Sequence, residues 1–310
     1  MRVLTLLGFF SFLSSLLVGC TQKSSPSADL NEGASLLIWP QVTSQFVVAR
    51  NIEILLPADY KSATEKRYGV VYMMDGQNLF SLEGSHWGKC WELDDSLQAL
   101  PSEDPLRNFI VVGIHSVPTR FLEYCPQKPV QTLPIDSLAT WRGGIDPQEV
   151  YSDAFLRFVV EELIPMVDDS LRTIRHRDER IMAGSSMGGL IALYGVMEYP
   201  EVFSGAACIS THWPLRIDAD SELFPKAMQQ YLANRLPEIT HLPRLYFDFG
   251  TETLDAPYES HQLNVDALLD SLGYDSSLRK TLKFDGAAHD EFAWREGMRA
   301  VEALRFASGH

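Results

Sequence analysis

The sequence predicts one large α/β domain with a mostly parallel central sheet and helices on both faces. Short apolar runs bounded by turn residues recur along the chain, a pattern typical of buried strands. Segments with helical periodicity separate these runs, so that strands and helices alternate. This alternation favours parallel strands, because each helix that connects two of them covers one face of the sheet.

The apolar runs give the expected strands in chain order. The segment 46–56 is expected to form one bent strand or a hairpin. Six buried strands are expected after it. They are YGVVYMM (68–74), NFIVVGI (108–114), RIMA (180–183), FSGAACIS (203–210), RLYFDFG (244–250) and TLKFDG (281–286).

Helices are expected between and after these strands. The Pro-rich segment 116–148 lacks periodicity and is expected to form a lid or pocket wall, since loops of this length are usually functional. The expected helices cover residues 92–100, 150–171, 190–199, 260–273 and 291–306.

Composition narrows the classes of partner. The 310 residues include 41 acidic and 26 basic side chains, giving a formal net charge of −15. A field of this sign repels phosphate backbones, so nucleic acid is not an expected partner. The sequence has no His-Glu-x-x-His motif and no paired-Cys spacing, so we expect neither a metal nor a cofactor.

The first residues are typical of an export signal. Arg2 is followed by an apolar run and then by small residues, a pattern too short and too poorly flanked for a stable membrane span. We expect residues 1–19 to be a signal peptide. The polar, Ser-rich stretch that follows predicts a flexible tether over residues 20–40, and the catalytic domain is expected over 41–310.

The end of the signal, Leu17-Val18-Gly19-Cys20, resembles a bacterial lipobox. This resemblance implies a lipid-modified Cys20 that anchors the mature protein to a membrane. Thr21 follows the cysteine, which by analogy with lipoprotein sorting implies the outer membrane, facing the periplasm or the surface. Export also permits a disulfide, and a bond between Cys90 and Cys125 stays open at this point.

The stretch GSSMGG marks a candidate nucleophile. Gly184, Ser186 and Gly188 fit the pattern Gly-x-Ser-x-Gly, between an expected strand and an expected helix. In this context the serine occupies a strained turn, and side chains at the two glycine positions would collide with the neighbouring backbone. The helix start also brings N–H groups to a developing oxyanion.

A serine of this kind needs a base, which follows it in the chain after an acid. His289 lies in a small-residue loop after the last expected strand and is the best-placed histidine. The acid is expected in the loop after RLYFDFG, where both Glu252 and Asp255 could orient the imidazole.

The ordered set YMMDGQNLF, GSSMGG, STHWP, DFGTETLDAPY and GAAHDEFAW resembles a family of α/β-hydrolase esterases. That family includes enterochelin esterases, feruloyl and acetyl-xylan esterases, and mycolyltransferases. The resemblance implies the α/β-hydrolase fold over about residues 45–307. It also implies an oxyanion hole formed by the backbone N–H groups of Gln77 and Met187, and it favours Asp255 over Glu252 as the acid.

Aromatic residues in the expected loops suggest a site for a sugar ring or an aromatic acyl group. Trp87, Tyr124 and Trp213 are the candidate substrate-binding residues. In the segment TRFLEY, Arg120 and Glu123 are expected to form an ion pair that holds the long loop; the alternative is that they bind polar groups of the substrate.

The sequence therefore predicts an exported serine esterase that acts through an acyl-enzyme, on carbohydrate-linked or siderophore-type esters. One alternative is an acyltransferase that uses the same triad. Another is a non-catalytic binding lipoprotein on a hydrolase scaffold, against which the retention of Ser186, His289 and nearby carboxylates argues.

Overall fold

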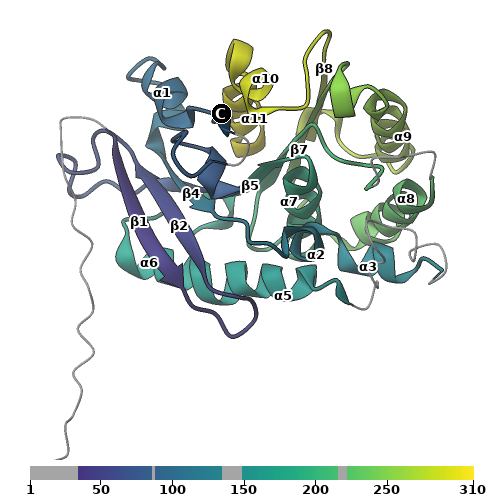
Figure 1. The fold of residues 1–310 in the computed structure, drawn as a ribbon, viewed down its shortest axis with the longest axis horizontal. Coiled ribbons are helices and arrows are strands. Elements are labelled where there is room, and N and C mark those ends of the chain that lie inside the picture. The colour runs from purple at the N-terminus through teal and green to yellow at the C-terminus, as the bar shows by residue number, and fades with distance from the viewer. Residues whose placement is uncertain (1–33, 86–87, 135–148, 216–221) are drawn as a thin grey trace, which may run out of the picture.

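The structure, a computed structural model, describes residues 34–85, 88–134, 149–215 and 222–310. Its sheet has the strand order β1-β2-β4-β3-β5-β6-β7-β8 (Figure 1). Strands β3 to β8 run parallel, whereas β1 and β2 pair antiparallel. The strands are β1 (Ser35–Val42), β2 (Arg50–Leu56), β3 (Gly69–Met74), β4 (Phe109–Ile114), β5 (Arg180–Ser185), β6 (Gly205–Ile209), β7 (Arg244–Gly250) and β8 (Arg279–Phe284).

The six expected strands are confirmed as β3 to β8, and the mostly parallel sheet is confirmed with them. Burial is confirmed for β3 to β7, whereas β8 lies at the edge of the sheet and is only partly buried. Successive side chains of a strand point to opposite faces, and the central strands are buried on both. In β3, Tyr72 and Met74 belong to one apolar core, and Val71 and Met73 belong to the other. The continuous apolar runs of the sequence follow from burial on both sides.

Helices cover both faces of this sheet (Figure 1). The helix after the candidate serine is apolar all round, as a helix enclosed by protein must be. One face of the sheet packs against α5 (Ser152–Arg157), α6 (Ile164–Ser170), α7 (Met187–Glu198), α8 (Leu223–Arg235) and α9 (Tyr258–Ser271). The other packs against α1 (Leu93–Gln98), α10 (Glu291–Arg295) and α11 (Arg299–Ser308).

The helix expected over 150–171 is interrupted. A π-helical segment, Phe158–Leu163, lies between α5 and α6. Pro165, the second residue of α6, has no N–H to donate to the carbonyl four residues earlier. A wider turn at this point accommodates the proline without ending the helical segment.

Strand β1 corrects the expected tether, which extended to residue 40. Residues 35–42 pair with β2 at the edge of the sheet. Leu36 and Ile38 point to solvent, while Leu37 and Trp39 pack against the core. Pro40 is tolerated because an edge strand does not need every N–H for pairing. The folded domain therefore includes β1, whereas the expected signal peptide and Cys20 lie outside the described residues.

The segment expected as an irregular lid is partly helical. Helices α2 (Arg120–Tyr124) and α3 (Gln127–Gln131) form its first part, and residues 135–148 lie outside the described residues. Helix α2 packs against α5 and α7. Its ordered contacts make this part of the segment a wall of the domain.

The cysteines of the described domain are unbonded. Cys90, Cys125 and Cys208 are all buried free thiols, so the disulfide that the sequence left open between the first two is not formed. Burial raises the pKa of the Cys125 and Cys208 thiols well above the usual range. In the same part of the chain, no helix has the length and hydropathy needed to span a bilayer.

Candidate active site

Ser186 lies at a sharp junction between strand β5 and helix α7. Its backbone has φ 58° and ψ −122°, a region that non-glycine residues rarely adopt and that costs about 1–3 kcal/mol. A Cβ atom added at Gly184 would lie 2.6 Å from the carbonyl carbon of Gly188, so the turn closes only with glycine there. This is the predicted strand–turn–helix geometry, and it leaves Ser186 partly exposed.

The turn after β3 packs directly against this junction. A Cβ atom added at Gly188 would lie 3.1 Å from the Met74 Cβ atom and 3.4 Å from the Asp75 Oδ2 atom. Gln77 lies two residues beyond Asp75, in a 3₁₀ turn (Gly76–Asn78).

Gln77 and Met187, the predicted oxyanion-hole residues, therefore lie on two turns that contact each other. Met187 is the first residue of α7, where a backbone N–H has no partner within the helix. The Gln77 side chain bonds to Ser116, donating from Nε2 to Oγ (2.8 Å) and accepting at Oε1 from the Ser116 N–H (3.0 Å). These bonds fix the 3₁₀ turn and so orient its backbone.

His289 and Asp255 form a hydrogen bond of 2.5 Å between Nδ1 and Oδ1. A carboxylate only accepts, so the imidazole proton is on Nδ1 and Nε2 has the free lone pair. Asp255 is fully buried and also accepts from Ser210 Oγ and from the Gly250 N–H, each at 2.6 Å. Burial alone would raise the pKa of Asp255, but these donors and His289 lower it below its usual value.

Glu252, the alternative acid, has an exposed side chain. Its backbone N–H donates to the Ala287 carbonyl, a bond that joins the loop after β7 to the loop after β8 and does not involve the imidazole. The geometry therefore pairs Asp255 with His289.

Three aromatic side chains surround the His289 ring, and one of these residues bonds through its backbone to the Ser186 turn. The His212 N–H donates to the Ser186 carbonyl (3.2 Å), and the His212 ring lies 6.5 Å from the His289 ring. Tyr258 and Trp294 pack edge-on against His289, with centroid distances of 5.8 and 5.1 Å. Serine, histidine and acid thus lie beyond the carboxyl ends of neighbouring strands, where ligands bind in open parallel sheets.

The predicted Arg120–Glu123 ion pair is wrong, because each residue binds another partner. Arg120 donates to Asp75 through Nε (2.6 Å) and Nη2 (2.7 Å), which ties α2 to the turn beside Ser186. Burial acts against the Arg120 charge, but the Asp75 carboxylate more than offsets it and raises the Arg120 pKa. Glu123 pairs instead with Arg50, and both side chains are fully buried.

Two of the predicted substrate-binding residues are corrected by their burial. Tyr124 is 0% exposed, and its hydroxyl accepts from the Asp75 N–H (3.4 Å). Trp213 is 1% exposed and donates from its indole N–H to the Gln262 Oε1 atom (3.0 Å). Both rings use their polar group inside the fold, where a substrate does not reach them. The third, Trp87, lies outside the described residues.

Sequence reasoning missed Ser210 as a partner of Asp255. It follows the apolar strand β6 and is fully buried, with a backbone φ of 42°. A second missed residue is Asp248, whose carboxylate interrupts the apolar run RLYFDFG. A charge inside a buried strand must be paired, so the aspartate within this apolar run was a signal in the sequence for a buried ion pair.

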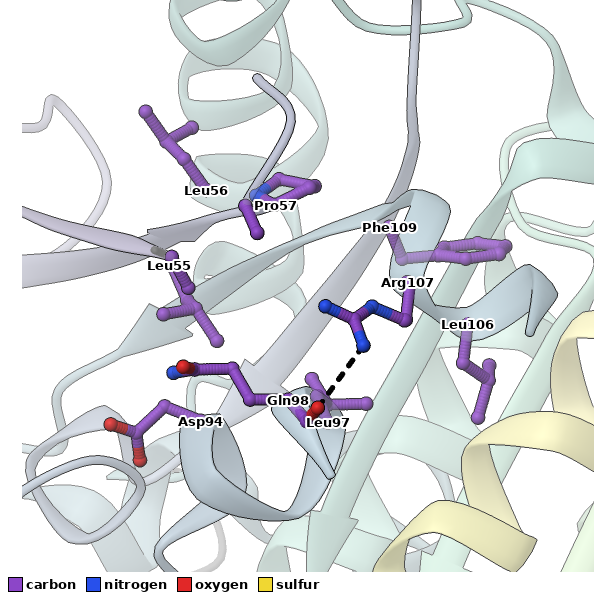
Figure 2. Close-up of a pocket in the computed structure, with 11 residues that line it drawn as sticks. Leu55, Leu56, Pro57, Asp94, Leu97, Gln98, Leu106, Arg107 and Phe109 are labelled. Carbon is purple, nitrogen blue, oxygen red and sulfur yellow. Dashed lines mark hydrogen bonds between the residues drawn. The ribbon is translucent and has the colours of Figure 1, made fainter. Parts of the chain in front are cut away.

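A cavity of about 30 Å³ lies at the amino end of the parallel strands, away from the candidate site. Figure 2 shows the side chains that line it. Leu55 and Phe109 line it near the start of β4, as the pairing of Leu55 with Val111 requires. This volume holds at most about two water molecules, too few for an ester substrate to replace. Within the described ranges, no group of His, Cys, Asp and Glu side chains has a geometry that could hold a metal ion.

Comparison with known proteins agrees with this geometry. A family model described as "Putative esterase" matches residues 44–298. "Uncharacterized protein YbbA" from Bacillus subtilis (strain 168) is 26% identical over 165 residues, which cover 53% of this chain and 58% of that protein. The match thus spans less than two thirds of that relative's length.

Solved structures give the same result for the fold. A ferulic acid esterase has a TM-score of 0.61 at 16% identity, with coverage of 89% of this chain and 98% of that one. The enterobactin esterase FES from Shigella flexneri has a TM-score of 0.59 at 19% identity, with coverage of 87% and 58%. At these identities the likeness shows the shared α/β-hydrolase fold.

Proposed function

We propose, since the chain belongs to the esterase family and is a carboxylic ester hydrolase, that it works through an acyl-enzyme formed on Ser186. His289 Nε2 removes the Ser186 proton as Oγ attacks the ester carbonyl carbon. The tetrahedral intermediate then expels the alcohol, which takes its proton from His289. Water attacks the acyl-enzyme with the same base, releasing the acid and restoring Ser186.

The observation that carries this proposal is the buried Asp255–His289 hydrogen bond. It holds the imidazole in the tautomer that accepts a proton at Nε2. The ionised Asp255 also stabilises the imidazolium that forms in the first step. The strained Ser186 backbone adds support, because such strain is concentrated at functional sites.

The oxyanion is proposed to bind the backbone N–H groups of Gln77 and Met187. Donors fixed before the reaction stabilise the developing charge without reorganisation. The Arg120–Asp75 pair and the Gln77–Ser116 bonds supply that rigidity on the β3 side.

The proposed substrates are esters of carbohydrates or of siderophore type. Two proteins of similar structure motivate this class, a ferulic acid esterase and an enterobactin esterase. A panel of an acetylated sugar, a feruloylated sugar and a catecholate ester tests it. Turnover of simple activated esters alone, with none of the three cleaved, would overturn the substrate class and leave the ester chemistry standing.

A fluorophosphonate probe tests the nucleophile. We expect stoichiometric labelling of the native protein, with the adduct on the peptide that contains Ser186. Ser186→Ala should remove both the label and, by several orders of magnitude, the esterase rate. Ser185→Ala is the matched control, because this neighbour ends the same strand and is buried. Labelling of Ser186→Ala at the native level would reject the assignment.

We further propose that the protein is exported and anchored through lipid on Cys20, in the outer membrane. The lipobox resemblance supports this, and the two or three acyl chains of such a cysteine give stable anchoring where one chain does not. Radiolabelled fatty acid should enter the wild type and not Cys20→Ala, which should leave the membrane fraction. Recovery of unlabelled wild type in the soluble fraction would contradict the proposal.

A further inference from the structure

A second buried ion pair lies behind the candidate acid. Arg299, the first residue of α11, donates to Asp248 on β7 from Nε (2.9 Å) and from Nη2 (2.5 Å). The two side chains are 1% and 0% exposed. Arg299 Nη2 also lies 3.9 Å from the Oδ2 atom of Asp255, so its charge reaches the acid itself.

Ser210 connects this pair to Asp255. Its Oγ atom accepts from the Trp294 indole N–H (2.9 Å) and from Arg299 Nη2 (2.8 Å). Indole and guanidinium groups only donate, so the single proton of the Ser210 hydroxyl is directed to Asp255 Oδ2 at 2.6 Å. The Ser210 N–H donates to Asp248 Oδ1 (2.9 Å), which fixes the backbone as well.

We propose that Ser210, held by Arg299 and Trp294, is a positioning residue that keeps Asp255 ionised and aimed at His289 Nδ1. This inference rests on the proposed function, because it assigns a task within the same site. Ser210 does not touch the reacting atoms and acts only through the acid. The Arg299–Asp248 pair in turn fixes the direction of the serine hydroxyl.

The physical consequence is a shared negative charge. Each donor to Asp255 Oδ2 draws charge away from Oδ1, the oxygen that faces His289. Loss of the Ser210 hydroxyl therefore strengthens the attraction between Asp255 and the imidazolium. The protonated, inactive form of His289 is then favoured in the free enzyme, and the acid limb of kcat/KM moves to higher pH.

Several charged or titratable groups face this network and contribute to the pH dependence of kcat/KM. They come from the elements that surround Asp255 and Ser210. These groups are His289 after β8, Arg299 on α11, Asp248 and Tyr246 on β7, Tyr258 on α9 and His212 after β6.

The first variant is Ser210→Ala, measured as kcat/KM against pH on one activated ester. We expect a loss of about ten- to a hundredfold at the optimum, because Asp255 loses the bond that aims it at His289; this is the usual range for a hydrogen bond to a charged group. We also expect the acid limb to move to higher pH. Ser210→Gly accompanies it, because glycine removes the hydroxyl and relieves the positive φ, so that backbone strain is not the cause of a shared loss.

Arg299→Lys keeps the positive charge but loses the planar fork that reaches both Asp248 and Ser210. We expect it to lower kcat/KM and to move the acid limb in the same direction as Ser210→Ala. The matched control is Arg50→Lys, in a fully buried pair with Glu123 on the α2 side. This control should lower the melting temperature and leave the acid limb in place.

The outcomes separate this inference from the proposed function. If fluorophosphonate labels Ser186 while both Ser210 variants keep the wild-type limb and a rate within twofold, the positioning role is wrong and the function stands. If wild-type Ser186 is not labelled, the proposed function itself fails. If the acid limb also moves in Arg50→Lys, the shift reflects a general loss of stability and not the task of Ser210, and the inference is overturned.

Discussion

Asp255 and Glu291 are two buried carboxylates near the candidate site, and their surroundings differ. Asp255 accepts from a histidine, a hydroxyl and a backbone N–H, and its pKa is lowered although burial acts to raise it. Glu291 accepts from Asn78 Nδ2 (3.0 Å), and its pKa is raised by burial and by the nearby Asp75 charge.

The difference shows that burial alone does not decide the charge of a carboxylate. Hydrogen-bond donors decide it when several converge on one group. Asp255 is therefore suited to the ionised role of a triad acid. Glu291 is suited to tying α10 to the 3₁₀ turn that includes Gln77, and its ionised form costs stability there.

The largest expected effect comes from Asp255→Asn. The amide loses the charge that stabilises the imidazolium and can favour the wrong tautomer, so kcat should fall by about 10⁴-fold. Glu252→Gln is the control, since its side chain is exposed, and its rate should stay near that of the wild type. Turnover of one activated ester, with melting temperatures alongside, measures both. Small losses in both variants would point to a Ser186–His289 dyad.

A moderate effect is expected from Glu291→Gln, which keeps the shape of the side chain and removes its charge. A carboxyl whose folded pKa is raised destabilises the fold above that pKa, and the penalty disappears as the pH falls below the unfolded value. The variant should therefore be more stable at pH 8, by about 0.5–2 kcal/mol.

Melting curves across the pH range measure this effect. The difference between Glu291→Gln and the wild type should shrink as the pH falls from the raised pKa of the folded state to 4.5, the ordinary glutamate value. Equal or lower stability of the variant at pH 8 would show that the surroundings of Glu291 stabilise its charge as well as those of Asp255 do. The contrast between the two carboxylates would then be wrong.

The smallest effect is expected from Lys89→Met. Lys89 pairs with Asp290 (2.6 Å) beside Glu291, but both side chains are partly exposed, so the pair should contribute about 0–1 kcal/mol. Added salt screens such a pair, so the stability difference between variant and wild type should fall as the ionic strength rises. Urea unfolding at low and high salt checks it. A loss of stability above about 2 kcal/mol that does not depend on salt would show that Lys89 behaves as part of a buried ion pair, and would contradict this prediction.

Much of the fold could be predicted from the sequence because the central strands are buried on both faces. Burial on both sides leaves unbroken apolar runs such as GVVYMM, which are easy to recognise. Strand β1 was missed because an edge strand alternates between exposed and buried residues and here includes Pro40. The π-helical segment before Pro165 has no periodicity signal of its own.

The site could be predicted where chemistry restricts the choice of residue. The Ser186 turn requires glycines on both sides, and His289 is the histidine placed after the last strand. Asp255 and Glu252 lie three residues apart in one loop, and only the 3₁₀ turn Thr253–Asp255 decides which carboxylate faces inward. Tyr124 was misassigned because a loop tyrosine suits a pocket and a buried hydrogen bond equally well.

Trapping the acyl-enzyme tests the central claim most directly. The protein is mixed with a slowly deacylated ester, quenched in acid during turnover, and examined by intact mass and peptide mass spectrometry. The account predicts one added acyl group per protein, on the peptide that contains Ser186, with none on Ser186→Ala. Turnover with no covalent adduct, or an adduct on another residue that persists in Ser186→Ala, would contradict it.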